Sequence, residues 1–132
     1  MNRTLWTVSA SSQYSVNVPP RVLDGSSSTY WSTTNTLLPA NIDLNMGTVR
    51  TVKGFNLTPP STSSYRFMTM EVLSSQDGNS WNQEGTFNLA TNTSTVRTLK
   101  FVTPVTAQYF RFNVTRGSGT TYTGIAEING VE

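Results

Sequence analysis

The chain has 132 residues, a length that suits one domain with a single hydrophobic core. Hydrophobic residues make up 36% and charged residues only 12%, which argues against a disordered tail or a nucleic-acid-binding arm. The net charge of +2 is too small to imply a polyanionic partner, so we expect no nucleic acid. Cysteine and histidine are both absent, which removes disulfides, thiolate metal sites and the usual general base.

Short runs that alternate polar and apolar residues recur along the chain, separated by Gly, Pro, Asn and Asp. The expected strands are residues 41–46, 49–57, 67–73, 81–89, 96–102, 109–114 and 125–131. Period-two alternation with this punctuation indicates antiparallel strands. We find no convincing amphipathic helix and expect at most one short turn, at residues 17–23. The sequence therefore predicts an all-β domain.

Three stretches rich in Ser and Thr lie between the expected elements, at residues 26–36, 61–64 and 117–123. Each of them carries or adjoins an aromatic residue. These aromatic residues are Tyr30, Trp31, Tyr65 and Tyr122. Polar loops that display aromatic side chains on a rigid scaffold are where binding is expected.

The acidic residues offer little for catalysis. A glycosidase needs two carboxylates facing one bond, and Asp24 and Glu127 are the only pair that we consider. Serines are plentiful, but no histidine is available to activate one. No glycine-rich phosphate-binding loop is present. We therefore expect that the chain is not an enzyme.

Targeting signals are missing from the sequence. No stretch approaches the ~20 apolar residues of a membrane span, so we expect no transmembrane segment. Residues 1–20 lack the basic start and apolar run of a signal peptide. We expect a single domain over residues 1–132 that has been excised from a longer protein, whose signal would lie upstream.

Six motifs follow one another in an order that matches a known family. They are Trp6-Thr-Val-Ser-Ala-Ser-Ser, Arg21-Val-Leu-Asp24-Gly25-Ser-Ser-Ser-Thr29-Tyr-Trp31-Ser-Thr, Ile42-Asp43-Leu44-Asn-Met-Gly47, Ser75-Gln-Asp77-Gly78-Asn-Ser-Trp81, Phe101-Val-Thr-Pro104-Val-Thr-Ala107-Gln-Tyr109-Phe-Arg111-Phe and Gly124-Ile125-Ala126-Glu127-Ile128. With these motifs the chain resembles the discoidin domain, also called the coagulation factor V/VIII type C domain. That superfamily includes the family 32 carbohydrate-binding modules, and the resemblance covers nearly the whole chain.

The resemblance implies a fold. It is an all-β, antiparallel, eight-stranded jelly-roll β-sandwich of the galactose-binding-like type, with the two termini close together. In such a fold Trp6, Trp31 and Trp81 are expected to anchor the core rather than to serve as sugar platforms, because large aromatic side chains bury well.

The resemblance also implies one structural calcium ion at the loop end. Carried over by position, its ligands would be the Arg21 carbonyl, the Asp24 carboxylate, the Ser26 carbonyl, the Thr29 carbonyl and hydroxyl, the Ala126 carbonyl and the Glu127 carboxylate. Calcium favours oxygen ligands of this kind. The alternative is that Asp24 caps a turn and that Glu127 pairs with an arginine.

The sugar site of galactose-binding relatives is only partly matched. Ser32, Pro60 and Ser64 stand where those relatives have histidine, arginine and asparagine, and only Tyr122 matches the late-loop aromatic. The candidate ligand-binding face is therefore Tyr30, Ser32, Asn35, Tyr65, Arg66 and Tyr122. For each tyrosine the alternative is a partly buried loop anchor, and for Arg66 a surface salt bridge is the simpler expectation.

We expect a non-catalytic carbohydrate-binding module that recognises a glycan through the loops at one end of the sandwich. It would act as a monomeric module of a larger, exported and bacterial protein, in an extracellular, cell-surface or periplasmic location. One alternative is a protein-interaction or spacer module of a cell-surface protein. The other is a lipid-binding discoidin domain, which the Ser/Thr-rich loops disfavour because such domains insert exposed apolar spikes into lipid.

Overall fold

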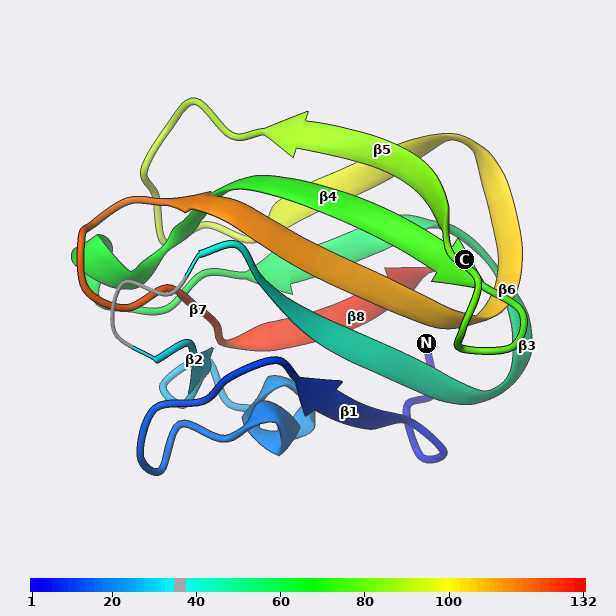
Figure 1. Cartoon of the computed structure of the whole chain (residues 1–132), viewed down its shortest axis with the longest axis horizontal. Helices are drawn as coiled ribbons and strands as arrows, with labels where there is room; N and C mark the ends of the chain where they lie inside the picture. Colours follow the sequence, from blue (N-terminus) through cyan, green and yellow to red (C-terminus); the bar gives the residue numbers. More distant parts are fainter. Residues whose placement is uncertain (35–37) are drawn as a thin grey trace.

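The computed structural model describes residues 1–34 and 38–132 of the chain. They form an antiparallel β-sandwich with two short 3-10 helices, η1 and η2 (Figure 1). The elements in order are β1 (Thr7–Ala10), η1 (Pro19–Leu23), β2 (Trp31–Ser32), β3 (Ala40–Thr58), η2 (Ser63–Tyr65), β4 (Phe67–Ser75), β5 (Asn82–Asn88), β6 (Arg97–Gly117), β7 (Gly124–Ile125) and β8 (Glu127–Val131). The eight strands within these residues confirm the expected fold class.

Strand β3 is longer than the sequence predicts, because the expected strands 41–46 and 49–57 both lie within it. Its register against β6 shifts between Asn45 and Arg50. Such an irregularity lets a strand bend sharply while it stays in the sheet. Gly47, which predicts a strand end, adopts a φ of +79° at this bend, and this conformation suits glycine.

Strand β6 likewise joins two expected strands, 96–102 and 109–114. Pro104 lies inside it and is exposed to solvent. The expected strands 67–73, 81–89 and 125–131 correspond to β4, β5 and β7–β8. Strands β1 and β2 fall outside the sequence prediction because they are too short to show a clear alternation.

The bent strands β3 and β6 each contribute to both layers of the sandwich (Figure 1). In the first layer, β1 pairs with the first half of β3, which pairs with the second half of β6, then β4 and β5. In the second layer, the first half of β6 pairs with the second half of β3, which also pairs with β8. The small sheet of β2 and β7 lies at one end.

The core lies between these layers and follows directly from the alternation of side chains. In β3 the residues Ile42, Leu44 and Met46 are buried, while the residues between them are partly exposed. Phe55 packs edge-on against Phe110 with 4.9 Å between ring centroids. Other core residues include Trp6, Val22, Trp31, Leu57, Phe67, Met70, Phe112, Ile125 and Ile128.

The expectation that all three tryptophans anchor the core is wrong for one of them. Trp6 is 6% exposed and Trp31 is fully buried. Trp81 lies just before β5, is partly exposed and contacts Arg111 across its ring. It sits on the outer face of the first layer because the turn before β5 places it outside the space between the layers.

The expected turn at residues 17–23 is confirmed as η1, a 3-10 helix that begins with two prolines. Proline suits the first helical positions because it has a fixed φ and no N–H to satisfy. The helix buries Val22 and ends at Leu23, with Asp24 as the C-cap residue. The helix thereby places Asp24 and Gly25 next to β8.

The two termini lie at the same end of the sandwich, as expected (Figure 1). Arg50 contacts both of them: one nitrogen donates to the Asn2 carbonyl at 3.1 Å, and another lies 3.2 Å from the Glu132 carboxylate. Among the described residues no helix is long and apolar enough to cross a membrane.

Candidate binding site at the loop end

The loop end is built around the short pairing of β2 with β7. A Cβ on Gly124 would overlap the Trp31 carbonyl oxygen, so only glycine permits this approach of the two backbones. Beyond the pair, the Thr33 N–H donates to the Thr123 carbonyl at 2.8 Å, and the Thr123 N–H donates to the Thr33 hydroxyl at 3.1 Å. The early loop and the late loop are therefore held together.

The middle loop is attached to the late loop through Ser118. Its hydroxyl donates to the Ser63 carbonyl at 2.7 Å, and its N–H donates to the Arg66 carbonyl at 2.8 Å. The Arg66 N–H returns a bond to the Ser118 hydroxyl at 3.0 Å. These three hydrogen bonds position η2 and Tyr65 beside Tyr122.

Four tyrosines form a chain of contacts across the assembled loops. The ring centroids of Tyr30 and Tyr65 lie 6.0 Å apart, those of Tyr65 and Tyr122 lie 5.4 Å apart, and both pairs are edge-on. The fourth member, Tyr14, lies 4.2 Å from Tyr122. We call Tyr14, Tyr30, Tyr65 and Tyr122 the tyrosine cluster. The fold thus brings together three aromatic residues that the sequence placed in separate loops.

Tyr14 is the member that sequence reasoning missed. It precedes the expected strands and lies outside the three Ser/Thr-rich stretches, so no pattern marks it. Its backbone N–H donates to the Ser32 carbonyl at 3.0 Å, which holds it beside the late loop. Hydrogen bonding with the Tyr14 hydroxyl is the main cause that raises the pKa of Tyr122 above its ordinary value.

The remaining predicted ligand residues behave differently. Ser32 is fully buried, and its hydroxyl accepts a hydrogen bond from the Asn17 amide at 3.2 Å. It therefore supports the loops from beneath and does not reach the surface. Asn35 lies outside the residues that the structure describes.

Arg66 makes no surface salt bridge with a described residue, which corrects the simpler expectation from the sequence. Its guanidinium donates to the Pro60 carbonyl at 3.0 Å, to the Ser61 carbonyl at 3.1 Å and to the Asn92 amide oxygen at 2.8 Å. The Arg66 side chain thus links the loop at Pro60 and Ser61 to the loop at Asn92.

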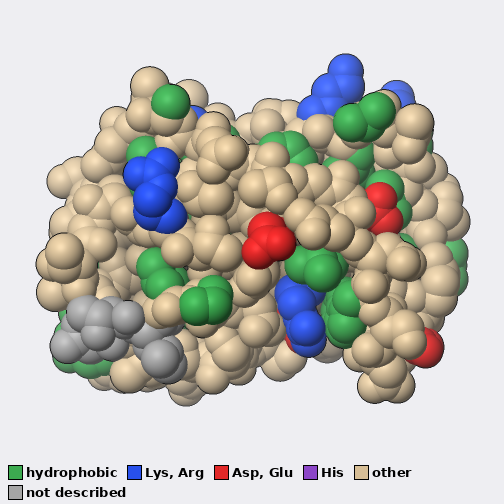
Figure 2. Space-filling view, turned by 45° about the horizontal axis from the view of Figure 1, so that its top comes forward, with side chains coloured by type: hydrophobic (Ala, Val, Ile, Leu, Met, Phe, Trp, Pro, Cys, Tyr) green, Lys and Arg blue, Asp and Glu red, His purple; other side chains and the backbone are tan. Residues whose placement is uncertain are grey.

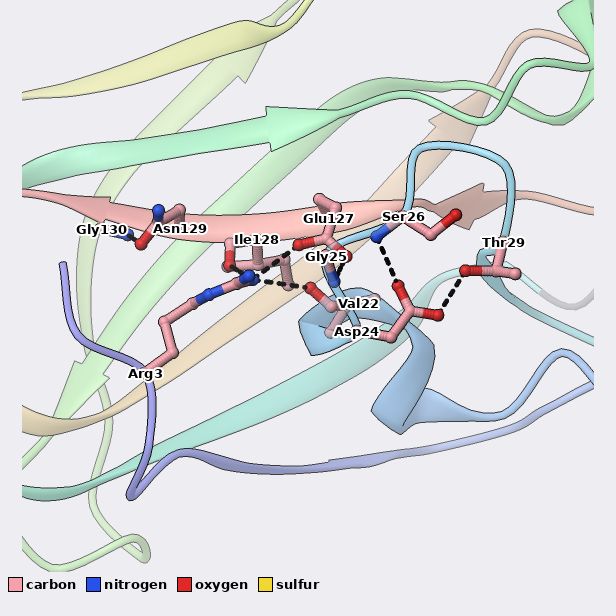
Figure 3. Close-up of polar contacts among 10 residues, drawn as sticks. All are labelled: Arg3, Val22, Asp24, Gly25, Ser26, Thr29, Glu127, Ile128, Asn129 and Gly130. Carbon is pink, nitrogen blue, oxygen red and sulfur yellow. Dashed lines mark hydrogen bonds and ion pairs between the residues drawn. The ribbon is translucent and has the colours of Figure 1, made fainter.

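The acidic residues of the proposed calcium set lie where the end of η1 meets the start of β8 (Figure 3). The Asp24 carboxylate accepts hydrogen bonds from the Ser26 N–H at 2.9 Å and from the Thr29 hydroxyl. The Glu127 carboxylate accepts from the Gly25 N–H at 2.8 Å. Glu127 thereby fastens the early loop to the last strand, while Asp24 orders the loop from within.

Arg3 is a member of this region that the sequence did not indicate. Its guanidinium lies 2.6 Å from the Glu127 carboxylate and also donates to the carbonyls of Ile128, at 3.0 Å, and Val22, at 3.4 Å (Figure 3). Both alternatives stated for the acids are therefore present in the structure, since Asp24 caps a turn and Glu127 pairs with an arginine.

The pKa values of the two acids shift in opposite directions. Burial raises the pKa of Glu127, and the neighbouring Asp24 carboxylate adds to this effect while Arg3 opposes it. Burial also acts to raise the pKa of Asp24, but hydrogen bonds from Thr29 and Ser26 outweigh it and hold that pKa below its ordinary value. Each carboxyl group is thus among the causes of the other's pKa shift.

Carboxylate and hydroxyl oxygens are of the ligand type that a hard cation prefers. Two adjoining carboxylates repel each other when both are charged, and a cation between them would relieve the repulsion. The Thr29 hydroxyl donates to Asp24, and the further oxygens of the proposed set are backbone carbonyls. Among the described residues no group of three or more His, Cys, Asp or Glu side chains gathers, so a metal here would depend on such backbone oxygens.

The sequence matches the F5/8 type C domain over residues 7–128. Among curated proteins none matches the sequence significantly. Among solved structures, CpGH89CBM32-5 from Clostridium perfringens in complex with GalNAc-β-1,3-galactose is 22% identical, with a TM-score of 0.90 and coverage of 98% of this chain and 97% of that chain. At this identity the likeness establishes the fold.

Two other solved structures give the same picture. The family 32 carbohydrate-binding module of Clostridium perfringens NanJ in complex with galactose is 22% identical, with a TM-score of 0.87, and the match covers 97% and 94% of the two chains. Chitosan-binding module 1 of a chitosanase/glucanase from Paenibacillus sp. IK-5 is also 22% identical, with a TM-score of 0.83 and coverage of 98% and 97%.

Proposed function

Because the chain belongs to the F5/8 type C domain family, we propose that it is a carbohydrate-binding module whose loop end recognises a glycan. The domain type is non-catalytic. The observation that carries the proposal is the tyrosine cluster, in which four loop aromatics from distant parts of the chain meet at one end of the sandwich. Similar solved structures are carbohydrate-binding modules, and several were solved with a sugar bound.

The chemistry of the cluster suits an uncharged sugar. The faces of aromatic rings attract the C–H groups of a pyranose, and phenol hydroxyls can both donate to and accept from sugar hydroxyls. Tyr30, Tyr65 and Tyr122 are each partly exposed, so ring faces and hydroxyls are available at the surface. The nearby guanidinium of Arg66 is engaged with loop carbonyls and an amide.

The residues around the cluster disfavour recognition of galactose in the manner that the resemblance implies. Ser32, in place of histidine, is buried and bonded to Asn17. Pro60, in place of arginine, is buried too and offers its carbonyl to Arg66. We therefore propose that any sugar bound here is held by tyrosines and by loop backbone rather than by charged side chains.

A structural calcium ion is part of the proposal. Arg21, Asp24, Ser26, Thr29, Ala126 and Glu127 would hold it, and its charge would offset the two carboxylates. Its role would be to fix the early loop against β8, which in turn positions Tyr30. We also propose that the chain works as a monomeric module within a longer exported protein.

A glycan array tests this function. The wild type is compared with Tyr122→Ala, which removes one ring of the tyrosine cluster, and with a control, Val102→Ala. Val102 lies in the first half of β6 and is 99% exposed, so its truncation should disturb neither the core nor the loop end. We expect the wild type and the control to bind at least one neutral glycan and Tyr122→Ala to lose that binding. Equal binding by all three proteins would refute the assignment.

A further inference from the structure

A hollow lies away from the tyrosine cluster, on the outer face of the first layer. Its volume is about 300 Å³, and Ser9, Asp43, Asn45, Gly78, Trp81 and Tyr109 border it. It lies between β1, β3, β6 and the turn that joins β4 to β5. Figure 1 places that turn toward the end that holds the termini, whereas β2 and β7 lie toward the opposite end.

Trp81 supplies an aromatic ring at the border of this hollow. It is the one tryptophan that is not buried, since Trp6 and Trp31 are buried and the chain has three. The Arg111 guanidinium lies 4.2 Å from the centre of the ring, a distance at which a cation and an aromatic face attract each other. This contact holds the ring in place, which lowers the entropy cost of using it for binding.

The Arg111 guanidinium is also fixed and neutralised by Asp43. Two of its nitrogens donate to the two oxygens of the Asp43 carboxylate, each at 2.8 Å. The bonds with Asp43 raise the pKa of Arg111 although burial opposes them. A paired carboxylate and guanidinium offer directed acceptors and donors without net charge, and such a pair suits hydroxyl groups better than an ion.

The opposite border is also polar and ordered. The Asn45 amide oxygen accepts hydrogen bonds from the Gly47 N–H at 2.8 Å and from the Gln108 amide nitrogen at 3.0 Å. The Gln108 amide nitrogen also lies 3.4 Å from the Tyr109 hydroxyl. Gly78, at a φ of +79°, packs close to the Tyr109 ring, because a Cβ there would meet it at 3.5 Å. The side chains around the hollow are thus fixed before any ligand arrives.

From this geometry we infer that the hollow is a second saccharide site, independent of the loop end, that takes one neutral sugar ring. Its volume lies at the lower limit of ligand pockets, which suits a monosaccharide unit rather than a long chain. Figure 2 shows acidic and basic side chains scattered among hydrophobic and other side chains on the face in view, rather than a block of one charge. A partly exposed indole beside paired polar groups matches the mixed apolar and hydroxyl surface of a pyranose.

The position of Trp81 gives the inference a specific readout. A two-dimensional nitrogen–proton NMR spectrum of the labelled chain contains three indole N–H signals, and Trp81→Phe identifies the one from Trp81. The probes are methyl β-galactopyranoside, methyl β-glucopyranoside, methyl α-mannopyranoside and N-acetylgalactosamine, each titrated to about 50 mM to detect weak binding. We expect at least one to shift the Trp81 signal progressively and to saturate.

Two variants separate this site from the loop end. Ser9→Tyr places a bulky side chain at the border of the hollow, on the exposed face of β1, and tyrosine suits a strand. It should weaken the response at Trp81 by about tenfold or more. Tyr122→Ala should leave that response unchanged, because Tyr122 belongs to the loop end.

Each other outcome overturns the inference. The hollow is not a sugar site if no probe shifts the Trp81 signal in a folded wild type, or if Ser9→Tyr responds like the wild type. A response that disappears in Tyr122→Ala belongs to the loop end and leaves no independent second site. Failure of the loop-end function appears separately, as loss of the difference between wild type and Tyr122→Ala on the array.

Discussion

The Arg3 guanidinium lies 2.6 Å from the Glu127 carboxylate and joins the first residues of the chain to its last strand. The side chains are only 21% and 15% exposed, so water screens the pair weakly. Arg3 also donates to the Val22 and Ile128 carbonyls. One side chain thus ties together the N-terminal segment, η1 and β8.

Removing this tie should destabilise the fold. We expect Arg3→Met to lower the free energy of unfolding by about 1–3 kcal/mol, because Glu127 would keep a partly buried charge without its partner. Urea denaturation followed by tryptophan fluorescence measures the change. Arg50→Met is the matched control, since Glu132 in that pair is 60% exposed, and we expect a loss of less than about 1 kcal/mol. Equal losses in the two variants would contradict this account.

The opposite pKa shifts predict how stability depends on pH without calcium. The pKa of Glu127 is raised in the fold from 4.5, so the folded state holds its proton longer and stability falls as pH rises through the range above 4.5. The pKa of Asp24 is lowered from 3.8, so its contribution is complete above 3.8 and is lost as pH falls further.

Denaturation across this pH range checks the signs. In Glu127→Gln the decline above pH 4.5 should disappear, since the titrating group is gone. In Asp24→Asn the loss below pH 3.8 should become smaller. An unchanged decline in Glu127→Gln would show that another group causes it.

Calcium should raise the melting temperature if the proposed set of oxygens holds it. Binding to the folded state alone stabilises that state in proportion to the logarithm of the calcium concentration. We expect the melting temperature to fall in excess chelator and to recover with calcium, and Asp24→Asn to abolish the difference. An unchanged melt in chelator, together with no calcium by elemental analysis, would remove the metal from the proposal.

Tyr14 provides a test of the tyrosine cluster that the sequence did not offer. Its ring lies 4.2 Å from that of Tyr122, so its removal should free Tyr122 to move. We expect Tyr14→Ala to weaken binding of any glycan found on the array by about tenfold. Titration calorimetry measures the affinity, and Tyr14→Phe should retain most of it. A Tyr14→Ala protein with wild-type affinity would exclude this residue.

A tyrosine titration addresses the same contact by another property. Because hydrogen bonding with Tyr14 is the main cause of the raised pKa of Tyr122, Tyr14→Phe should lower that pKa toward its ordinary value of 10.0. Ultraviolet absorbance at alkaline pH follows the ionisation, with Tyr122→Phe identifying the signal. No change in Tyr14→Phe would mean that other neighbours cause the shift.

The sequence predicts the features that depend on local order. Alternation within β3 and β6 indicates which side chains face the core, and the two prolines predict the short turn η1. The six motifs, taken in order, identify the fold. The strand ends expected at Gly47 and Pro104 are wrong because a bulged strand can bend and still keep its sheet pairing.

Only the tertiary structure reveals contacts between distant residues. Arg3 meets Glu127 across a separation of 124 residues, and Tyr14 meets Tyr122 at the loop end, yet no local pattern predicts either pair. Trp81 looks like a core residue in the sequence, but the turn before β5 leaves it partly exposed on the sheet. The physical reason is that periodicity determines which way a side chain points within its own strand, whereas the bending and stacking of the layers determine which side chains meet.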